Sequence, residues 1–416
     1  MRSEWFLPAS DRTVPAILKR QKERFGDRPC ITIPGANWRH GDLVSVAASR
    51  GAALVEVGVK RGDRVAVMCQ NRAEMLETVL GCAWVGAIVV PINCACMGPQ
   101  IEYFLADSGS IFLIIEQQYL GRMSAVDLSR TCLSQLWVVG TGEGGAAYDI
   151  STLRASSWQQ SSSIVDAADI LPSDIFAILY TSGTTGPSKG VMCSHAHYYW
   201  WGANTAQMLD LRYDDVLCTT LPLFHINALH TFLQAAITGC KVHYHDRFFA
   251  SGYWSAMHES NATVIYLLGA MVPFLLAQPP SVTERGHKVR IGLGPGIPKK
   301  AGEAFTERTG VLMLEGYGAT ETNLMIAASP DSPRRGVMGW LCSEFDARVV
   351  DEYDNELPNG EAGELVVRAS EPFAFASGYW GKPEKTIEAW RNLWFHTGDR
   401  VVRDADGAYR FIDRIK

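Results

Sequence analysis

Short apolar runs alternate with longer, helix-like stretches through most of this chain, and this alternation limits its fold more than any other feature. The run RVAVMC (64–69) precedes the helix-like stretch NRAEMLETVLGCAWVG (71–86), which is followed by the run AIVVPIN (87–93). Later runs of the same kind are IFAILYT, VLCTTLP, TVIYLL and VRIGLG. Strand–helix alternation is typical of α/β proteins with largely parallel sheets. We therefore predict an α/β fold.

The most apolar stretch of the chain, VLGCAWVGAIVVPINCACM (79–97), is about as long as a membrane span. Pro91 and Asn93 interrupt it, so we expect a buried helix that leads into a buried strand and no membrane span. The N-terminus lacks the apolar core of a secretory signal.

The character of the sequence changes near Gly339. The following stretch, ARVVDEYDNELPNGEAGELVVR, has the alternation and turn residues of antiparallel hairpins, and Asp406-Gly407 is a further turn signal. We predict an α/β core over residues 1–340, made of two interleaved subdomains, and a small β subdomain over residues 341–416.

Composition limits the partners and the compartment. The chain of 416 residues has a formal net charge of −6, which gives no reason to expect a nucleic acid as partner. Its ten cysteines are scattered and form no C-x-x-C pair. This usage favours reduced thiols and a cytoplasmic location.

The segment YTSGTTGPSKG (180–190) is the strongest functional signal. A glycine-rich loop after a buried strand can present backbone N–H groups to phosphate, and its hydroxyls and Lys189 add further donors. The pattern of a P-loop fails, because Ser188 stands where a glycine is needed and Gly190 where a hydroxyl should bind magnesium. A solvated loop without a ligand is the plainer interpretation, which the density of glycines and hydroxyls disfavours.

Five further motifs follow in a fixed order. They are LPLFHINAL (221–229), GLGPGIP (292–298), EGYGATET (315–322), WFHTGD (394–399) and FIDRIK (411–416). Together with SGTTGPSKG, in which Pro and Ser are transposed relative to the usual signature, they resemble the adenylate-forming superfamily of acyl-CoA synthetases, adenylation domains and luciferases. The resemblance implies two Rossmann-like αβαβα subdomains and a small β-barrel subdomain. The first 170 residues fit this family by pattern only.

The resemblance also assigns roles to residues. It implies that Lys189 and Thr184 act on the phosphates of ATP, that Thr320 binds the α-phosphate, that Glu321 ligates Mg²⁺ and that His225 gates the acyl site. Tyr317 is expected to stack on adenine, Asp399 to bind the ribose and Arg414 to reach the ribose or phosphate. The further nucleotide-binding residues that it implies are Thr181, Ser182, Gly183, Thr185, Gly186, Gly294, Pro295, Gly296, Glu315, Gly316 and Gly318.

The implied reaction activates a carboxylic acid. Its carboxylate attacks the α-phosphorus of ATP to give acyl-AMP and pyrophosphate, and the acyl group then passes to a nucleophile, usually the thiol of coenzyme A. ATP, Mg²⁺ and coenzyme A are the expected cofactors. The protein contributes positioning and electrostatics more than covalent chemistry.

The acid itself is constrained by the residues expected around it. Amino-acid-activating relatives hold the substrate ammonium with an Asp that follows the aromatic residue of the segment 221–229. This chain has Phe224-His225-Ile226-Asn227 there and no acidic residue, so we expect that the substrate is not an amino acid. Small and apolar residues favour a neutral pocket for an aryl or medium acyl carboxylate. The expected pocket residues are His225, Asn227, Gly269, Gly294, Gly318 and Ala319. The aromatic run 198–201 could narrow this pocket or belong to the core.

Relatives continue beyond the hinge motif into a C-terminal lid domain that supplies a second lysine, and this chain stops at Lys416. Three interpretations follow: an acyl-CoA ligase without its lid, a ligase that passes the acyl group to an amine, and a non-catalytic nucleotide-binding remnant. The family also makes a homodimer a further partner to test.

Overall fold

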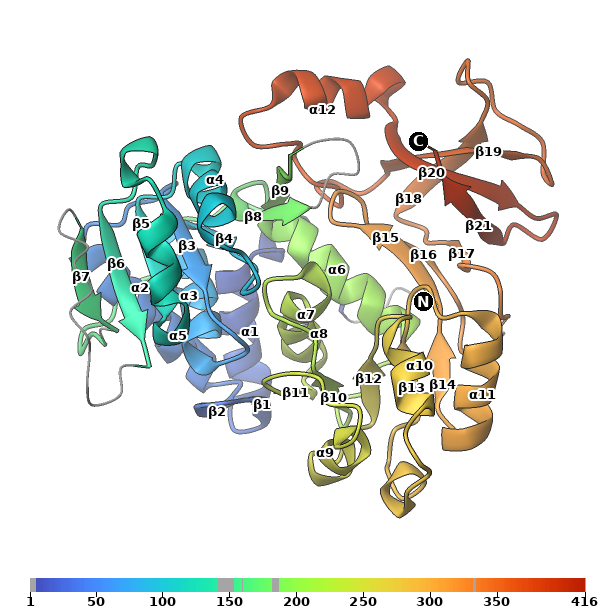
Figure 1. Cartoon of the computed structure of the whole chain (residues 1–416), viewed down its shortest axis with the longest axis horizontal. Helices are drawn as coiled ribbons and strands as arrows, with labels where there is room; N and C mark the ends of the chain where they lie inside the picture. Colours follow the sequence, from blue (N-terminus) through green and yellow to red (C-terminus); the bar gives the residue numbers. More distant parts are fainter. Residues whose placement is uncertain (1–4, 141–152, 159, 182–186, 332–333, 416) are drawn as a thin grey trace.

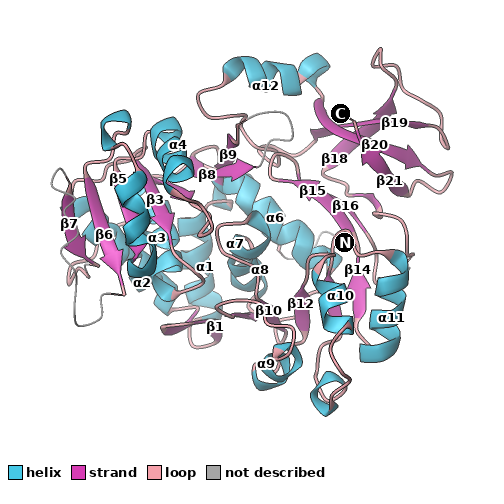
Figure 2. Ribbon diagram, viewed as in Figure 1, coloured by secondary structure: helices cyan, strands magenta, loops and turns pink. Residues whose placement is uncertain are grey.

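The computed structural model describes residues 5–140, 153–158, 160–181, 187–331 and 334–415. Within these residues, two large mixed sheets with their covering helices form the α/β core, and two smaller antiparallel sheets follow. Figure 1 shows the first large sheet at one side of the molecule, the second below its centre, and the small C-terminal sheet at the opposite upper corner. Figure 2 shows helices on the outside of the large sheets and between them. The predicted α/β fold is confirmed.

The first sheet is parallel except at one edge. Its strands lie in the order β7 (Arg154–Ser157), β6 (Gln135–Val139), β5 (Phe112–Glu116), β3 (Arg64–Met68), β4 (Ile88–Pro91), β8 (Ile175–Thr181) and β9 (Lys189–Ser194). Only the last pair, β8 and β9, is antiparallel in the described sheet. The apolar runs of the sequence are the buried central strands, as parallel sheets require.

The second sheet takes strands from distant parts of the chain. Its strands lie in the order β14 (Leu312–Leu314), β13 (Ile291–Leu293), β12 (Val264–Tyr266), β10 (Val216–Thr219), β11 (Lys241–Tyr244), β1 (Pro29–Ile33) and β2 (Ala36–Arg39). The N-terminal hairpin of β1 and β2 thus joins a sheet whose other strands come after the first sheet is complete. The two sheets are interleaved in the sequence.

The helices have the following bounds. They are α1 (Val14–Phe25), α2 (Asp42–Glu56), α3 (Ala73–Val85), α4 (Gly98–Ser108), α5 (Gln117–Leu120), α6 (His195–Met208), α7 (Ile226–Leu229), α8 (Thr231–Thr238), α9 (Tyr253–Glu259), α10 (Met271–Leu276), α11 (Lys299–Thr309) and α12 (Pro383–Ala389). Short 3₁₀ turns cover Ala9–Asp11, Gly121–Ala125, Leu128–Arg130, Val282–Glu284 and Arg391–Leu393.

The apolar stretch 79–97 is a buried helix followed by a buried strand, as predicted. Helix α3 ends at Gly86, whose φ of 76° suits glycine, and β4 begins two residues later. Among the described residues, no helix has both the length and the apolarity that a membrane crossing needs. All ten cysteines lie in the described parts of the chain and carry free thiols.

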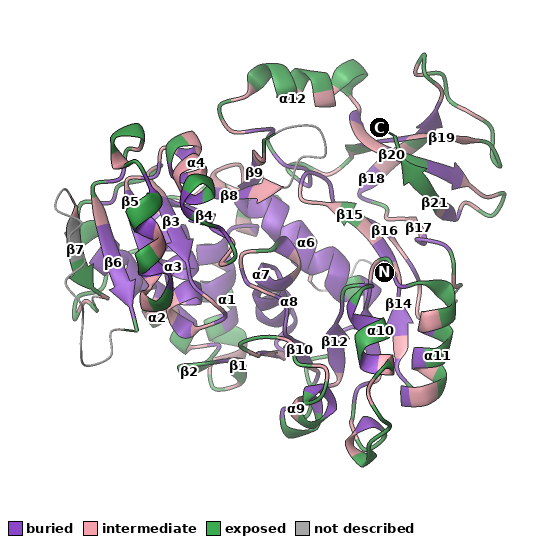
Figure 3. Ribbon diagram, viewed as in Figure 1, coloured by how far each residue is buried: buried purple, intermediate pink, exposed green. Residues whose placement is uncertain are grey.

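Helix α6 runs through the interior between the two large sheets. The Ser194 hydroxyl caps it by accepting a hydrogen bond from the His197 N–H at 3.1 Å. Nearly every residue of the helix is buried, so it has no solvent-exposed face, and Figure 3 shows it buried along its length. Tyr198 packs edge-on against Phe176 of β8, while Gly202 lies against α8. The helix therefore contacts elements of both sheets.

Antiparallel strands dominate the last quarter of the chain, as predicted. A short sheet contains β15 (Gly316–Ala319), β16 (Asn323–Ala327) and β17 (Trp340–Leu341). The C-terminal sheet has the order β18 (Phe345–Val350), β19 (Ala362–Ala369), β20 (Phe395–Arg403) and β21 (Tyr409–Arg414), with antiparallel pairing throughout. This four-stranded sheet lies within residues 341–416, the range for which a small β subdomain is predicted.

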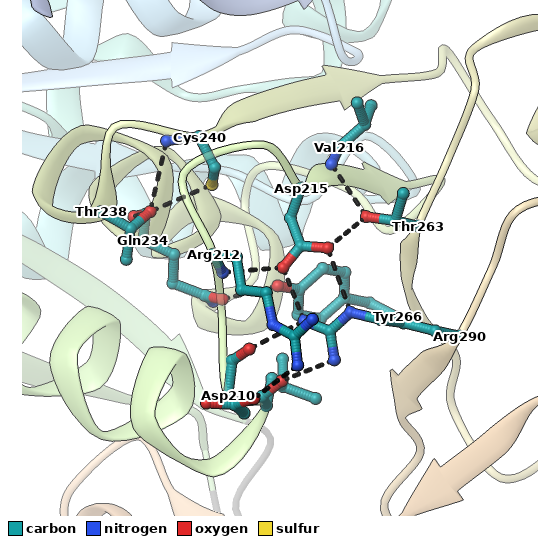
Figure 4. Close-up of polar contacts among 11 residues, drawn as sticks. Asp210, Arg212, Asp215, Val216, Gln234, Thr238, Cys240, Thr263, Tyr266 and Arg290 are labelled. Carbon is teal, nitrogen blue, oxygen red and sulfur yellow. Dashed lines mark hydrogen bonds and ion pairs between the residues drawn. The ribbon is translucent and has the colours of Figure 1, made fainter.

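A buried carboxylate fastens one end of the second sheet (Figure 4). Asp215, just before β10, accepts hydrogen bonds from the Thr263 hydroxyl at 2.6 Å and from Nη2 of Arg290 at 2.6 Å. These residues precede three neighbouring strands, β10, β12 and β13. Nearby, the Tyr266 hydroxyl donates to Oε1 of Gln234 at 2.5 Å, which links β12 to α8.

Candidate active site

The predicted phosphate loop connects two antiparallel strands at the edge of the first sheet. Thr181, the last residue of β8, pairs with Lys189, the first residue of β9. Between them, the predicted residues Ser182, Gly183, Thr184, Thr185 and Gly186 lie outside the described residues.

Lys189 and Glu321, far apart in the sequence, are connected through Tyr379. The Nζ atom of Lys189 lies 4.2 Å from the centroid of the Tyr379 ring, a cation–π geometry. The Tyr379 hydroxyl donates to Oε1 of Glu321 at 2.9 Å, and Glu321 is buried. Burial, and then the charge of Glu321, raise the pKa of Tyr379 well above its usual range, so it is a neutral donor. The structure thus joins the predicted phosphate lysine to the predicted magnesium ligand.

The sequence did not single out Tyr379 as a site residue. The segment around it lies along β9: the Met192 N–H donates to the Gly378 carbonyl at 2.9 Å, and the Trp380 N–H to the Gly190 carbonyl at 2.8 Å. The Ala376 N–H donates to the Glu321 carbonyl at 2.9 Å. A chain segment almost 190 residues away in sequence therefore forms one wall of the predicted phosphate site.

Helix α4 supports the end of the predicted phosphate loop. The Tyr103 hydroxyl donates to the Ser188 carbonyl at 2.6 Å. One turn further along, Asp107 accepts from the Tyr180 hydroxyl at 2.8 Å and pairs with Lys382 at 2.5 Å. These contacts hold both strands that flank the loop, and nothing in the sequence around α4 predicts them.

Asp399 lies between two other residues predicted to bind nucleotide. One of its oxygens accepts a hydrogen bond from the Tyr317 hydroxyl, and the other accepts from Nε of Arg414 at 3.1 Å. Asp399 and Arg414 are register partners on β20 and β21, whereas Tyr317 comes from β15. Burial, followed by the charge of Asp399, raises the pKa of Tyr317 above its usual range.

Glu315, the first residue of the EGYG motif, connects this motif to the glycine-rich segment 292–298. Its carboxylate accepts a hydrogen bond from the Gly296 N–H at 3.1 Å, so the motifs 292–298 and 315–322 are in direct contact. Burial raises the pKa of Glu315 to about 7, although the hydrogen bond from Gly296 acts in the opposite direction.

The predicted pocket glycines allow close packing of the backbone. A Cβ atom on Gly269 would stand 2.0 Å from the Gly296 carbonyl oxygen, and one on Gly318 would stand 2.1 Å from the Asn323 carbonyl oxygen. A Cβ on Gly294 would meet the Ile297 side chain at 2.3 Å. Only at Gly296, among these four, is the space open. The Pro295 carbonyl accepts from the Gly269 N–H at 3.1 Å, which fixes this approach.

The turn that carries Thr320 and Glu321 is tight. The Ala319 N–H donates to the Thr322 hydroxyl at 3.0 Å, and the Thr322 N–H donates back to the Ala319 carbonyl at 3.0 Å. Thr320, in this turn, is half-buried. Gly316, the first residue of the preceding strand β15, is buried.

His225 lies at the start of α7. Its side chain is exposed on one face and contacts the Phe224 ring at a centroid distance of 4.6 Å. Asn227 is half-buried in the first turn of the same helix.

Comparison with known proteins identifies the family. Residues 18–380 match the family model described as AMP-binding enzyme. A crotonobetaine/carnitine–CoA ligase of Salmonella paratyphi B is 31% identical over 370 residues, which cover 86% of this chain and 70% of that protein.

Solved structures give the same result. The anthranilate CoA ligase AuaEII, crystallised with anthranoyl-AMP, matches 99% of this chain and 79% of its own chain with a TM-score of 0.87 at 25% identity. The N-terminal domain of FACL13 from Mycobacterium tuberculosis matches 97% of this chain and 99% of its own with a TM-score of 0.81 at 24% identity, which shows the shared fold. This chain therefore belongs to the AMP-binding enzymes of the adenylate-forming superfamily.

Proposed function

We propose that this protein activates a carboxylic acid with ATP and transfers the acyl group to coenzyme A. In the first step a carboxylate oxygen attacks the α-phosphorus of ATP, and pyrophosphate leaves. In the second step the thiol of coenzyme A attacks the acyl carbon, and AMP leaves. The named relatives are CoA ligases, and one was crystallised with an acyl-adenylate, which supports this reaction class.

The observation that carries the proposal is the link from Lys189 through Tyr379 to Glu321. One end of the link is the Lys189 ammonium over the ring, which suits phosphate oxygens, and the other is the buried Glu321 carboxylate, which suits a metal ion. When ATP binds, the ammonium of Lys189, still held over the ring, would donate to phosphate oxygens. The protein would thus hold the phosphates in line for attack, which lowers the barrier by positioning and charge.

Mg²⁺ fits the residues present. Glu321 offers the hard carboxylate oxygen that this ion prefers, and its hydrogen bond with Tyr379 orients the group so that Oε2 would ligate the metal. Among the described residues no cluster of three metal-binding side chains occurs. Phosphate oxygens and water would therefore complete the coordination, as is usual for Mg²⁺ in nucleotide sites. Bound there, Mg²⁺ would neutralise charge on the phosphates.

Asp399 would bind the ribose hydroxyls of the nucleotide. Its two oxygens now accept from Tyr317 and Arg414, and those contacts keep the carboxylate oriented. Gly296, with open space beside it, would lie next to the base. His225 and Asn227 would border the acid, which we propose to be an aryl or medium acyl carboxylate. We also propose that the α/β core and the small β subdomain meet near residue 340. We further propose that the protein assembles as a homodimer.

Two measurements test this function. Isothermal titration calorimetry should detect AMP and Mg²⁺·ATP binding to the protein. Incubation with ATP, Mg²⁺ and a panel of acids, followed by addition of either coenzyme A or amines, should give acyl-CoA in preference to amide. Absence of nucleotide binding would refute the proposal, and a product formed only with amines would replace its second step.

A further inference from the structure

The buried helix α6 carries polar side chains along one face. They stand at positions i, i+4, i+7 and i+8, which place them on one side of a helix. We name this set the α6 polar stripe: His197, Trp201, Asn204 and Thr205.

These side chains have hydrogen-bonding atoms without partners. Both ring nitrogens of His197, Nε1 of Trp201, both amide atoms of Asn204 and the Thr205 hydroxyl are buried and unpaired in the described structure. Asn204 is only 4% exposed. Buried polar atoms are paired in the great majority of cases, because an unpaired one costs about 1–3 kcal/mol. Six such atoms lie on the stripe, and the Tyr198 hydroxyl and Nε1 of Trp200 on the same helix are unpaired as well. Water or a bound molecule must therefore supply partners to α6 that the described protein does not.

His230 adds a donor to the same region. Its ring stacks on Trp201 at a centroid distance of 5.2 Å. Because Oε1 of Gln234 accepts from Tyr266, the Gln234 amide N–H is the group that faces Nδ1 of His230, at 2.8 Å. Nδ1 is then the acceptor and the proton is on Nε2, which is buried and has no partner in the described residues. Figure 4 shows the Gln234–Tyr266 pair that fixes this arrangement.

The stripe is bordered by the motifs of the candidate site. At one end, the His197 carbonyl accepts from the Asn323 amide at 3.0 Å, and Asn323 lies two residues beyond Glu321. At the other end, Met208 lies 3.5 Å from where a Cβ on Gly316 would stand. Across the stripe, His230 directly follows the short helix α7 that starts beside His225. The stripe thus lies between the nucleotide motif and the segment predicted to border the acid.

The stripe is polar but uncharged. Burial lowers the pKa of both His197 and His230 to about 3, so both rings are neutral at physiological pH. The stripe supplies a donor at Trp201 and an amide that both donates and accepts at Asn204, and the neighbouring His230 adds a second donor. A second carboxylate or an ammonium on the substrate would find no opposite charge among these groups. A hydroxyl, which both donates and accepts, matches an amide and a neutral imidazole.

We propose that the α6 polar stripe recognises the acyl part of the substrate, and that this acid carries an uncharged hydroxyl that bonds to Asn204. The inference rests on the proposed function and narrows its substrate class from neutral acids in general to hydroxyl-bearing ones. Such a site would discriminate strongly, because an analogue without the hydroxyl leaves buried groups unpaired. Asn204 would be a specificity-determining residue and would not touch the nucleotide.

The test uses non-hydrolysable acyl-adenylate mimics, acyl-sulfamoyl adenosines, bound to the protein and measured by calorimetry. The mimics are made in matched pairs: 2-, 3- and 4-hydroxybenzoyl against the corresponding methylbenzoyl compounds, and ω-hydroxyhexanoyl against heptanoyl. Methyl and hydroxyl have similar volume, so each pair isolates the hydrogen bond. We expect at least one hydroxyl compound to bind about tenfold or more tightly than its methyl partner.

Substitutions assign the effect to the stripe. Asn204→Leu, with a side chain of similar size, should abolish the preference for the hydroxyl while AMP affinity stays within about twofold. Thr205→Val is a second, milder variant of the same face. Gln21→Met is the matched control, since the buried Gln21 amide on α1 is also unpaired but belongs to none of the motifs of the site. It should leave the preference unchanged.

Each outcome has a distinct meaning. If AMP and all mimics bind but no pair reaches the tenfold preference, ordered water satisfies the stripe and the inference is wrong while the proposed function stands. A preference for a cationic or dicarboxylic acid in the same assay also overturns it. If neither AMP nor any mimic binds, the proposed function itself fails and the inference falls with it. Because the paired comparison uses the unsubstituted protein, a variant that misfolds does not remove the test.

Discussion

The Nζ atom of Lys189 lies 4.2 Å from the centre of the Tyr379 ring, although the two residues are far apart in the sequence. The hydroxyl of the same ring donates to Glu321. A single side chain therefore positions both groups that we assign to the phosphates and the metal.

Replacing the ring should weaken Mg²⁺·ATP binding more than AMP binding. Tyr379→Leu removes a cation–π contact, worth about 0.5–2 kcal/mol, together with the hydrogen bond to Glu321. We expect Mg²⁺·ATP affinity to fall roughly threefold to tenfold, whereas AMP, which lacks the β- and γ-phosphates, should bind within about twofold. Tyr379→Phe keeps the ring and should have the smaller effect. Equal losses for AMP and ATP in calorimetry would show that Tyr379 acts only on the fold.

Asp399 should be needed for AMP itself. Asp399→Asn keeps the shape of the side chain but removes the charge, and we expect AMP affinity to fall about tenfold, or about 1.4 kcal/mol. Asp404→Asn is the matched control, because Asp404 belongs to the same small sheet and pairs with Arg410 and Arg334. Calorimetry that shows equal AMP affinity for the Asp399 variant and the control would contradict the ribose assignment.

The pair of the buried Asp215 and the half-buried Arg290 should contribute to stability. Asp215→Ala leaves Arg290 and the Thr263 hydroxyl without their acceptor, and we expect a loss of about 2–4 kcal/mol, at or below the roughly 3–5 kcal/mol of fully buried pairs. Denaturant unfolding measures this loss. The control is Arg212→Ala, which breaks the exposed pair with Asp210 and should cost less than about 1 kcal/mol. Similar losses in both variants would show that Asp215 contributes no more than a surface pair.

Glu315 should make stability depend on pH. Its folded pKa of about 7 lies above its ordinary value of 4.5, so between these values the folded protein holds a proton that the unfolded chain has lost. The free energy of unfolding therefore falls as pH rises through this window, and the stabilisation is complete only below about pH 4.5. Glu315→Gln cannot ionise. As pH rises from 4.5 to 7.5, the free energy of unfolding of this variant should therefore rise by about 1–2 kcal/mol relative to that of the unsubstituted protein. This figure already includes a discount for the partial exposure of Glu315.

Denaturant titrations at several pH values check this difference. Glu303→Gln on α11, an exposed glutamate, should run parallel to the unsubstituted protein. A parallel curve for Glu315→Gln as well would mean that its carboxyl is solvated in the folded state.

Local patterns were sufficient to predict much of the fold. The run at β3 and the helix-to-strand stretch at α3 and β4 follow from apolar runs and a glycine stop, which act over short distances. The hairpins after residue 340 follow from alternation and turn residues. The assignment of β1 and β2 to the second sheet could not be predicted, because nothing in a strand's own sequence names its neighbour.

The candidate site likewise contains residues that sequence motifs predict and residues that only the structure identifies. Asp399, Tyr317 and Glu321 could be proposed from the sequence because each stands in a recognisable motif, and the structure shows that the first two are in contact. Tyr379 and Tyr103 were missed because their importance comes from tertiary contacts with β9 and Ser188. The α6 polar stripe was missed for another reason: its polar residues have helical spacing but stand among buried aromatic residues on the other sides, so the helix lacks the contrast between a polar and an apolar face that marks an amphipathic helix.

The position of α6 also determines how this chain can be divided. Tyr198 of α6 packs on a strand of the first sheet, Gly202 packs on a helix of the second, and the N-terminal hairpin crosses from one sheet's part of the sequence to the other. A gene truncated near residue 195 would leave the first half with two orphaned strands, and the second half without the hairpin that completes its sheet. Neither half would be an autonomous folding unit, so shortened or permuted versions of this protein should keep α6, β1 and β2 in one polypeptide with both sheets.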